Sequence, residues 1–381
     1  MKCSKLFEKV VLNNNVEIKN RLTVAPMVVF SSNSDGSVSE EEREYLKKRG
    51  DDIGLFILGA ALINKESFIS PYISSAMSDK DIPALKERAE IIQSHGAKAI
   101  CQINHAGAHG KTPLVPSSDI AREDAEKKGQ NDKIFHEFTD IEIKETIKQF
   151  VNAAELSIKA GYDGVEIHGA NNYLIQQFYS PHTNKRTDDW GGSDEKRMKF
   201  ALQIVDEICK LKDQYNCPKF IIGYRLSPEE PYEDGLTMTE TLTLVKELVK
   251  KPLQYIHISQ KDYFKKARRG EGAGTERLKL IHNETKGKIA LIGVGGLLTE
   301  NDLSKAANSE FSEFIAVGCA CLLNPNLGTL LKEGKGEQLN IEIDPEQREK
   351  YFLPTNLWKM CLQGMDWMPP LKGKIKNKEE F

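Results

Sequence analysis

Eight short apolar runs, separated by segments of helical pattern, constrain this chain more than any other feature of its sequence. Several of the runs are apolar throughout, with no alternation of polar residues. Strands of this kind are buried on both faces, as in a parallel sheet. The runs are residues 22–26, 54–60, 97–104, 164–168, 219–225, 255–259, 289–294 and 314–318.

Between the runs, apolar residues recur at steps of three and four, which predicts helices over 143–158, 198–211 and 242–248. Eight strands that alternate with helices predict a closed (β/α)8 TIM barrel. An open doubly wound sheet is the structural alternative, but such sheets usually have five or six core strands. Although 381 residues would suit two or three domains of roughly 150, we expect residues 1–381 to form a single barrel domain.

A hairpin, three long loops and a C-terminal extension are expected in addition to the barrel. A hairpin over 10–20 is expected to cap its bottom. Long polar loops at 107–140, 180–194 and 260–276 each follow the carboxyl end of a strand, where barrel enzymes place their active sites. A C-terminal extension, about 344–381, is expected to pack on the barrel or on a neighbouring subunit, and the sequence leaves open a homo-oligomer.

Charge and cysteine content exclude several classes of protein. Lys and Arg number 53 against 56 Asp and Glu, so a nucleic-acid or membrane-surface partner, which needs a basic excess, is not expected. The first residues lack the apolar core of a signal peptide, which predicts a cytoplasmic protein. The 7 cysteines are scattered without a CxxC pair, so we expect reduced thiols and no metal centre.

The end of the fourth predicted strand carries the densest chemistry. His168 ends the strand, and Asn171 and Tyr173 follow within five residues. A His/Asn pair can hold a carbonyl oxygen and stabilise negative charge there, while a phenol can deliver a proton to a carbon of the same molecule. The alternative is structural, with His168 as a core histidine and Asn171 as a helix cap.

The stretch AGYDGVEIHGANNYLIQQFYSPHTNKRTDDWGGS, residues 160–193, resembles the signature of the Old Yellow Enzyme family of FMN-dependent oxidoreductases. Further landmarks of that family follow in order over roughly residues 5–370. They are Ala25-Pro26-Met27 after the first strand, Gln102-Ile103-Asn104-His105-Ala106-Gly107 after the third, Arg225 at the end of the fifth, and the glycines Gly295, Gly296 and Gly318.

The resemblance implies FMN as cofactor, NADH or NADPH as reductant, and a small enone-type substrate. It places Gln102 at the flavin's pyrimidine edge and Arg225 beside N1 and O2, where a cation favours the reduced form. It makes His168 and Asn171 the ligands of the substrate carbonyl and Tyr173 the proton donor. The remaining cofactor contacts that it implies are Ala25, Pro26, Met27 and Val28 near the ring system and Gly295, Gly296, Gly318 and Cys319 at the phosphate.

Three positions depart from the family pattern. Val28 stands where the family usually has Thr or Cys, so a hydrogen bond to flavin O4 is lost and the flavin should be harder to reduce. Ala108 replaces an Arg, and Cys319 replaces the Arg that helps hold the phosphate, so FMN should be held less tightly. Cys319 and Cys321 form a CxC that we interpret as buried thiols.

Three functions remain open on sequence. The first is an FMN-dependent ene-reductase that uses NAD(P)H to reduce the C=C bond of enones. The second is a flavin-free phosphosugar barrel enzyme, with Glu166 as a base or Lys261 as a Schiff-base lysine. The third is a non-enzymatic flavin-binding redox sensor. The basic loop of Lys265, Lys266, Arg268 and Arg269 is expected to be a solvated, mobile lid.

Overall fold

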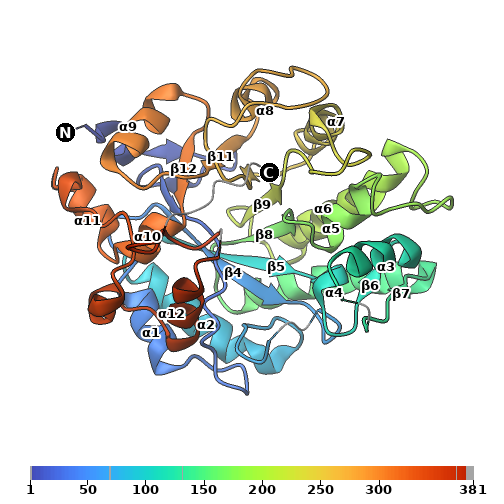
Figure 1. The fold of residues 1–381 in the computed structure, drawn as a ribbon, viewed down its shortest axis with the longest axis horizontal. Coiled ribbons are helices and arrows are strands. Elements are labelled where there is room, and N and C mark those ends of the chain that lie inside the picture. Colours follow the sequence, from blue (N-terminus) through green and yellow to red (C-terminus); the bar gives the residue numbers. More distant parts are fainter. Residues whose placement is uncertain (1, 68–69, 131, 366, 375–381) are drawn as a thin grey trace.

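The computed structural model describes residues 2–67, 70–130, 132–365 and 367–374. Its centre is a closed barrel of parallel strands, surrounded by helices (Figure 1), which confirms the predicted (β/α)8 fold. Each observed strand lies within a few residues of a predicted run. In barrel order the strands are β3 (Leu22–Val24), β4 (Leu55–Leu62), β5 (Lys98–Asn104), β8 (Gly164–Gly169), β9 (Ile221–Leu226), β10 (Tyr255–Ile258), β11 (Ala290–Val294) and β12 (Phe314–Val317).

The helices around the barrel pack apolar side chains into its core. Helix α4 begins with a capping box, in which the Thr139 hydroxyl accepts from the Glu142 amide and the Glu142 carboxylate accepts from the Thr139 amide. The outer helices are α1 (Glu40–Lys47), α2 (Ile82–Gln93), α4 (Asp140–Lys159), α6 (Asp194–Gln214), α7 (Met238–Leu248), α8 (Arg277–Thr285), α9 (Glu300–Ser309), α10 (Cys319–Leu323) and α11 (Leu327–Lys332). No helix in the described part of the chain is long and apolar enough to span a membrane.

The bottom of the barrel is closed as predicted. Strands β1 (Val10–Val11) and β2 (Glu17–Ile18) form an antiparallel hairpin. Its turn is fixed to the amino ends of barrel strands, since the Asn13 side chain donates to the Leu253 carbonyl at 2.8 Å and the Asn14 side chain to the Lys219 carbonyl at 3.2 Å. Apolar hairpin residues join a buried cluster with side chains from the lower barrel interior.

The upper barrel interior is polar instead. Strand register aligns Gln102, Glu166, Gly223 and Tyr255 across four neighbouring strands. Two residues further along, His168 aligns with Arg225, and Arg225 with His257, as a second layer. Because residues i and i+2 share a face of a strand, both layers point the same way. The bond between His257 on β10 and Glu166 on β8 skips the strand between them, so that shared face is the inside.

The expected loop at 107–140 is partly ordered, which corrects the prediction. It contains the 3-10 turn η3 (Gly107–His109), β6 (Leu114–Val115), α3 (Ser118–Lys127) and β7 (His136–Glu137), with β6 and β7 paired in parallel. Strands of two residues are too short to produce a readable period.

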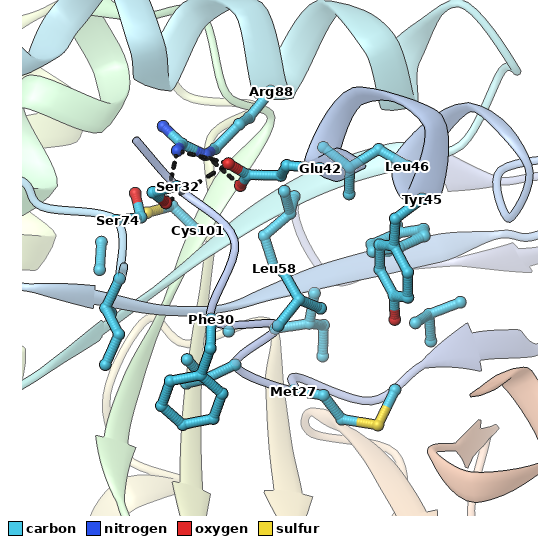
Figure 2. Close-up of a pocket in the computed structure, with 18 of the residues that line it drawn as sticks. Met27, Phe30, Ser32, Glu42, Tyr45, Leu46, Leu58, Ser74, Arg88 and Cys101 are labelled. Carbon is cyan, nitrogen blue, oxygen red and sulfur yellow. Dashed lines mark hydrogen bonds and ion pairs between the residues drawn. The ribbon is translucent and has the colours of Figure 1, made fainter. Parts of the chain in front are cut away.

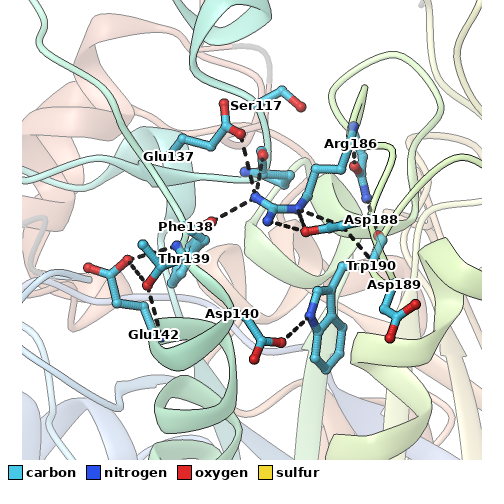
Figure 3. A network of polar contacts seen from close by, with 12 residues as sticks. Ser117, Glu137, Phe138, Thr139, Asp140, Glu142, Arg186, Asp188, Asp189 and Trp190 are labelled. Carbon is cyan, nitrogen blue, oxygen red and sulfur yellow. Dashed lines mark hydrogen bonds and ion pairs between the residues drawn. The ribbon is translucent and has the colours of Figure 1, made fainter.

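The loop at 180–194 is fastened to this excursion (Figure 3). The Arg186 guanidinium donates to the Phe138 carbonyl at 2.7 Å and to the Pro116 carbonyl at 3.1 Å. The Trp190 indole donates to the Asp140 carboxylate at 2.8 Å. The latter part of the signature stretch therefore holds two loops together beyond the carboxyl ends of β5 and β8.

The basic loop is hydrogen-bonded to the segment after β9, which the prediction of a solvated, mobile lid did not foresee, although Lys266 and Arg268 are exposed as predicted. Arg268 donates to the Glu230 carbonyl at 2.8 Å, and Arg269 to the Tyr232 carbonyl at 2.7 Å. The backbone amides of both arginines also donate to the Glu229 carboxylate. Sequence reasoning missed these hydrogen bonds because their acceptors, backbone carbonyls between β9 and α7, leave no pattern in the sequence.

The C-terminal extension packs on the barrel, beside α1 (Figure 1). It includes η5 (Pro345–Tyr351) and α12 (Thr355–Gln363). The buried Arg49 side chain donates to the carbonyls of Tyr351 and Cys321, and the Thr355 amide donates to the Glu41 carboxylate at 2.9 Å. Residues 375–381 of the predicted extension lie outside the described residues.

Gly223 leaves the space that the Tyr255 ring occupies in the polar barrel interior, and substitution of Gly223 tests this packing. A Cβ at this position would lie 2.1 Å from the Tyr255 ring. We expect Gly223→Ala to lower the free energy of unfolding by about 1–3 kcal/mol, the usual cost of overpacking. The measurement is urea unfolding in two backgrounds. In a Tyr255→Val background the ring is gone, so the same substitution should cost less; an equal cost would show that the ring is not the obstacle.

Candidate active site

The carboxyl end of the barrel gathers buried polar atoms that lack partners. Nδ1 of His168, Nε of Arg225 and Nε2 of His257 have no hydrogen-bond partner among the described residues, and neither do Oδ1 of Asn104 and Nε2 of His105. All five side chains are buried. Buried polar groups are normally satisfied, so this concentration of unpartnered atoms indicates a site that binds a polar ligand.

Below these atoms, Glu166 makes two hydrogen bonds. Its carboxylate accepts from the Gln102 amide nitrogen at 2.7 Å and lies 2.9 Å from Nδ1 of His257. Burial favours a raised pKa for Glu166, but His257, Arg225 and Gln102 outweigh burial and hold that pKa below its ordinary value. Glu166 is therefore an ionised group inside the barrel.

Arg225 brings a positive charge to the end of β9. The two carboxylates that follow β9 have other partners: Glu229 pairs with Arg277, and Glu230 accepts from Ser180 at 2.6 Å. Burial lowers the pKa of Arg225 and Glu166 raises it. Since an arginine stays protonated in proteins, its charge is available to a bound anion.

His168 and Tyr173 lie close together, and Asn171 lies between them in the segment that follows β8. The ring centroids of His168 and Tyr173 lie 5.0 Å apart. The ring centroids of His109 and Tyr173 lie 5.5 Å apart, in an edge-to-face arrangement. Asn171 follows β8 with φ of 57°, a left-handed conformation that Asn tolerates. Tyr173 immediately precedes the short helix α5 (Leu174–Tyr179).

The segment after β3 carries the predicted ring contacts. The Ala25 amide donates to the Val317 carbonyl at 2.9 Å. Pro26 and Met27 lie directly against Gly59 of β4, where a Cβ would be 2.6 Å from the Met27 nitrogen. On the other side, a Cβ on Gly318 would be 3.4 Å from the Met27 sulfur. The structure thus places Met27 beside Gly318, which the sequence assigned to the phosphate.

A buried ion pair holds the next part of this segment (Figure 2). Arg88 donates to the Glu42 carboxylate at 2.7 and 2.9 Å and to the Ser32 hydroxyl at 3.0 Å. Val28 and Phe30 line the pocket beside this cluster. The pair ties the segment after β3 to α1 and α2, so the predicted ring contacts rest on a fixed backbone.

Two of the predicted phosphate glycines, Gly295 and Gly296, lie in a loop whose backbone favours glycine. Gly295 has φ of 137° and Gly296 has φ of 64°. A Cβ on Gly295 would also lie 2.7 Å from the backbone of Asp262 and Tyr263. Only glycine fits such a conformation and approach.

Cys319, at the start of α10, is partly exposed and its thiol donates to the Trp367 carbonyl at 3.5 Å, whereas Cys321 is buried. The prediction of buried thiols is thus right for Cys321 and wrong for Cys319.

These residues fit FMN. The unpartnered atoms and the Arg225 charge suit the polar end of a flavin, the Met27 side chain suits its ring, and the glycine loops suit a phosphate. FMN bound there would accept hydride from a nicotinamide and donate it to a substrate.

Sequence reasoning did not assign a role to His257, Asn104, His105 or His109. A signal was present. Polar residues alternate in the strand pairs Gln102/Asn104, Glu166/His168 and Tyr255/His257, in strands that are otherwise apolar. Alternation of this kind marks one face of a strand as polar although the strand is buried.

The buried His105 predicts a dependence of stability on pH. Burial lowers its pKa to about 3, against about 6.5 in an unfolded chain. Below pH 6.5 the unfolded state therefore binds a proton that the folded state does not, and the free energy of unfolding decreases as pH falls. Between pH 7 and pH 5 this group should cost about 2 kcal/mol. In urea unfolding at both pH values, His105→Asn should lose about 2 kcal/mol less free energy of unfolding between pH 7 and pH 5 than the wild type loses. An equal loss in the variant and the wild type would show that His105 is not the group responsible.

Cys319→Arg tests the predicted phosphate position. A new charge-assisted contact contributes about 1.5–3 kcal/mol, so FMN should bind about 10- to 100-fold more tightly. Fluorescence titration of the apoprotein with FMN measures this affinity. Cys217→Arg, which adds the same charge beyond the end of α6, is the control. Equal affinity of the Cys319→Arg variant and the wild type would place the phosphate elsewhere.

Known proteins resemble this chain over nearly its whole length. The model of the NADH:flavin oxidoreductase / NADH oxidase family matches residues 5–338. A probable NADH-dependent flavin oxidoreductase of Bacillus subtilis (strain 168), YqiG, is 42% identical, with 96% of this chain and 97% of that protein covered. An NADH:fumarate oxidoreductase of Klebsiella pneumoniae (strain 342) is 34% identical over 94% of this chain, which spans 39% of that longer protein.

Solved structures share the fold. The Old Yellow Enzyme from Pichia sp. AKU4542 superposes with a TM-score of 0.72 at 24% identity, covering 87% of each chain. Morphinone reductase in complex with tetrahydroNAD superposes with a TM-score of 0.73 at 22% identity, covering 92% of this chain and 97% of that one. The family match and the identity to its relatives together show that this chain belongs to the NADH:flavin oxidoreductase / NADH oxidase family and is an FMN-dependent NAD(P)H oxidoreductase.

Proposed function

We propose that this protein uses NAD(P)H to reduce the activated C=C bond of α,β-unsaturated carbonyl compounds. The observation that carries the proposal is the joint placement of His168, Asn171 and Tyr173 at the end of β8. Two of these side chains would hold the carbonyl oxygen of the substrate, and the third would supply the proton.

Asn171 is oriented as a donor. Its amide oxygen accepts from the Ser259 hydroxyl at 2.7 Å, and its backbone amide donates to the Ser227 hydroxyl at 2.9 Å. The oxygen end of the side chain is thereby occupied, so the amide NH2 is the end that remains for a ligand. An NH2 group is the end required to bind a carbonyl oxygen.

His168 is a neutral partner for that oxygen. Burial, with Arg225 and His257, lowers its pKa well below the ordinary value. A neutral imidazole has one N–H donor, which stabilises a developing negative charge without a permanent cation.

Tyr173 keeps its proton at neutral pH. Burial raises its pKa, and Arg225 only partly offsets this. A phenol that remains protonated, beside the group that holds the substrate carbonyl, suits a general acid that protonates the neighbouring carbon.

We assign the cofactor contacts on the same basis. Gln102 and Arg225 would bind the pyrimidine end of FMN, and Met27 would pack near its ring system. Ala25, Pro26 and Val28 would border that ring. Gly295, Gly296, Gly318 and Cys319 would surround the phosphate.

The two residues on which the flavin-free phosphosugar alternative depends are not placed to act as its catalytic groups. Glu166 is fully buried and bonded to Gln102 and His257, so it is not free to act as a base on a sugar phosphate. Lys261 lies in the loop after β10 and not on a strand. The alternative of a non-enzymatic sensor is overturned by the family match to oxidoreductases.

Relatives widen the substrate screen. Two proteins that match this chain over about a third of their own length are named NADH:fumarate and NADH:acrylate oxidoreductases. Both names denote alkenes conjugated to a carboxylate. Such acids belong beside enones and enals in the first assays.

Tyr173→Phe should separate the two half-reactions. Oxidation of NAD(P)H needs no proton from this phenol, so flavin reduction should keep its rate. Reduction of an enone should slow by roughly 10²–10⁴, the usual contribution of a positioned general acid. Stopped-flow absorbance measures each step. Tyr215→Phe, at an exposed tyrosine after α6, is the control. Equal slowing of both steps in Tyr173→Phe would remove Tyr173 from the donor role.

A further inference from the structure

Glu166 is a buried carboxylate for which the proposed function has no use. We propose that Glu166 is a positioning residue of the flavin site, which orients the Gln102 amide, fixes the proton on His257 and offsets the charge of Arg225. The inference rests on the placement of FMN proposed above. It adds a determinant of the flavin's reduction potential.

The orientation of Gln102 follows from hydrogen-bond chemistry. The 2.7 Å contact joins Oε1 of Glu166 to the amide nitrogen of Gln102, and both side chains are buried, at 0% and 2% exposure. An ionised carboxylate only accepts hydrogen bonds, so the NH2 group of Gln102 must face it. The amide oxygen is then turned away from Glu166. It is an acceptor suited to the N3–H of a flavin.

His257 is fixed in the same way. Its Nδ1 lies 2.9 Å from Oε2 of Glu166, so Nδ1 carries the proton. Burial lowers the pKa of His257 and outweighs the opposite effect of Glu166, which keeps the ring neutral. Nε2 is consequently an acceptor, and it is one of the buried atoms that has no partner in the described part of the chain.

The charge balance links Glu166 to the flavin. Glu166 on β8 aligns with Gly223 on β9, two residues before Arg225, so the side chains of Glu166 and Arg225 share the barrel interior. Glu166 accordingly raises the pKa of Arg225. The site beneath the cofactor therefore holds one positive and one negative charge. A reduced flavin carries more negative charge near N1 and O2 than an oxidised one, so a nearby carboxylate disfavours reduction. Removing the Glu166 charge should leave Arg225 unopposed and favour the reduced flavin.

A purely structural ion pair would behave differently. It would change the stability of the protein when broken, without moving the potential of the flavin in a defined direction. The reduction potential of bound FMN thus separates a positioning role from a structural one.

The experiment compares Glu166→Gln with the wild type by equilibrium reduction of the FMN-loaded protein against a reference dye. We expect the equilibrium constant for two-electron reduction to rise at least tenfold, a shift of about 30 mV to higher potential. Glu230→Gln is the matched control. Glu230 is also buried, but it accepts from Gln176, Ser180 and the Leu236 amide, none of which is a predicted flavin contact. An unchanged or lower potential in Glu166→Gln overturns the proposal.

Arg225→Gln and the double variant Glu166→Gln/Arg225→Gln complete the cycle. Arg225→Gln should lower the potential, and the double variant should lie above Arg225→Gln alone. The double variant removes both buried charges, so neither is left without its partner. If Glu166→Gln does not fold, comparison of the double variant with Arg225→Gln still measures the effect of Glu166 on the potential. If Arg225→Gln shifts the potential while removal of Glu166 in either background does not, only the role of Glu166 fails. If Arg225→Gln changes neither potential nor FMN affinity, the placement of FMN fails, and the inference with it.

The tautomer can be read without FMN. In ¹⁵N NMR of the wild-type apoprotein, His257 should show a protonated Nδ1 and an unprotonated Nε2. A proton on Nε2 would contradict the geometry assigned to Glu166.

Discussion

The ionised Glu166 inside the barrel, shared between Gln102, His257 and the charge of Arg225, is the interaction on which the site depends. A carboxylate taken out of water is costly unless it is paired and fully hydrogen-bonded. The barrel meets this requirement by aligning polar residues in register on β5, β8, β9 and β10, and by leaving Gly223 without a side chain so that the Tyr255 ring fits. The lower barrel is apolar and closed by the hairpin, which confines the polar layers to the end where the loops lie.

The rest of the structure keeps that end in shape. The Arg88–Glu42 pair fixes the segment after β3 against α1 and α2, and Arg186 fixes the loop after β8 to the excursion after β5. Arg268 and Arg269 fix the loop after β10 to the one after β9. In each case an arginine crosses between segments that are distant in sequence. Loops that carry a binding site are thereby attached to a rigid scaffold, as is usual for barrel enzymes.

The sequence predicted the barrel because continuous apolar runs can be recognised from neighbouring residues alone, without knowledge of the fold. It also brought His168, Asn171 and Tyr173 together, since they follow one strand within a few residues. It missed β6, β7 and α3, whose short or highly charged segments give no period. It also missed the hydrogen bonds of the basic loop, because backbone acceptors leave no pattern in a sequence. The role of Glu166 depends on a partner on β10, 91 residues away, and only the closed barrel shows that the two side chains meet.

A crystal structure of the protein with FMN tests the central claim most directly, namely that the polar upper layer of the barrel is the flavin site. The pyrimidine edge should lie against the Gln102 amide oxygen and the Arg225 guanidinium, with the phosphate at Gly295, Gly296 and Gly318. Density for FMN at any other place, or Gln102 with its amide oxygen turned to Glu166, would contradict it.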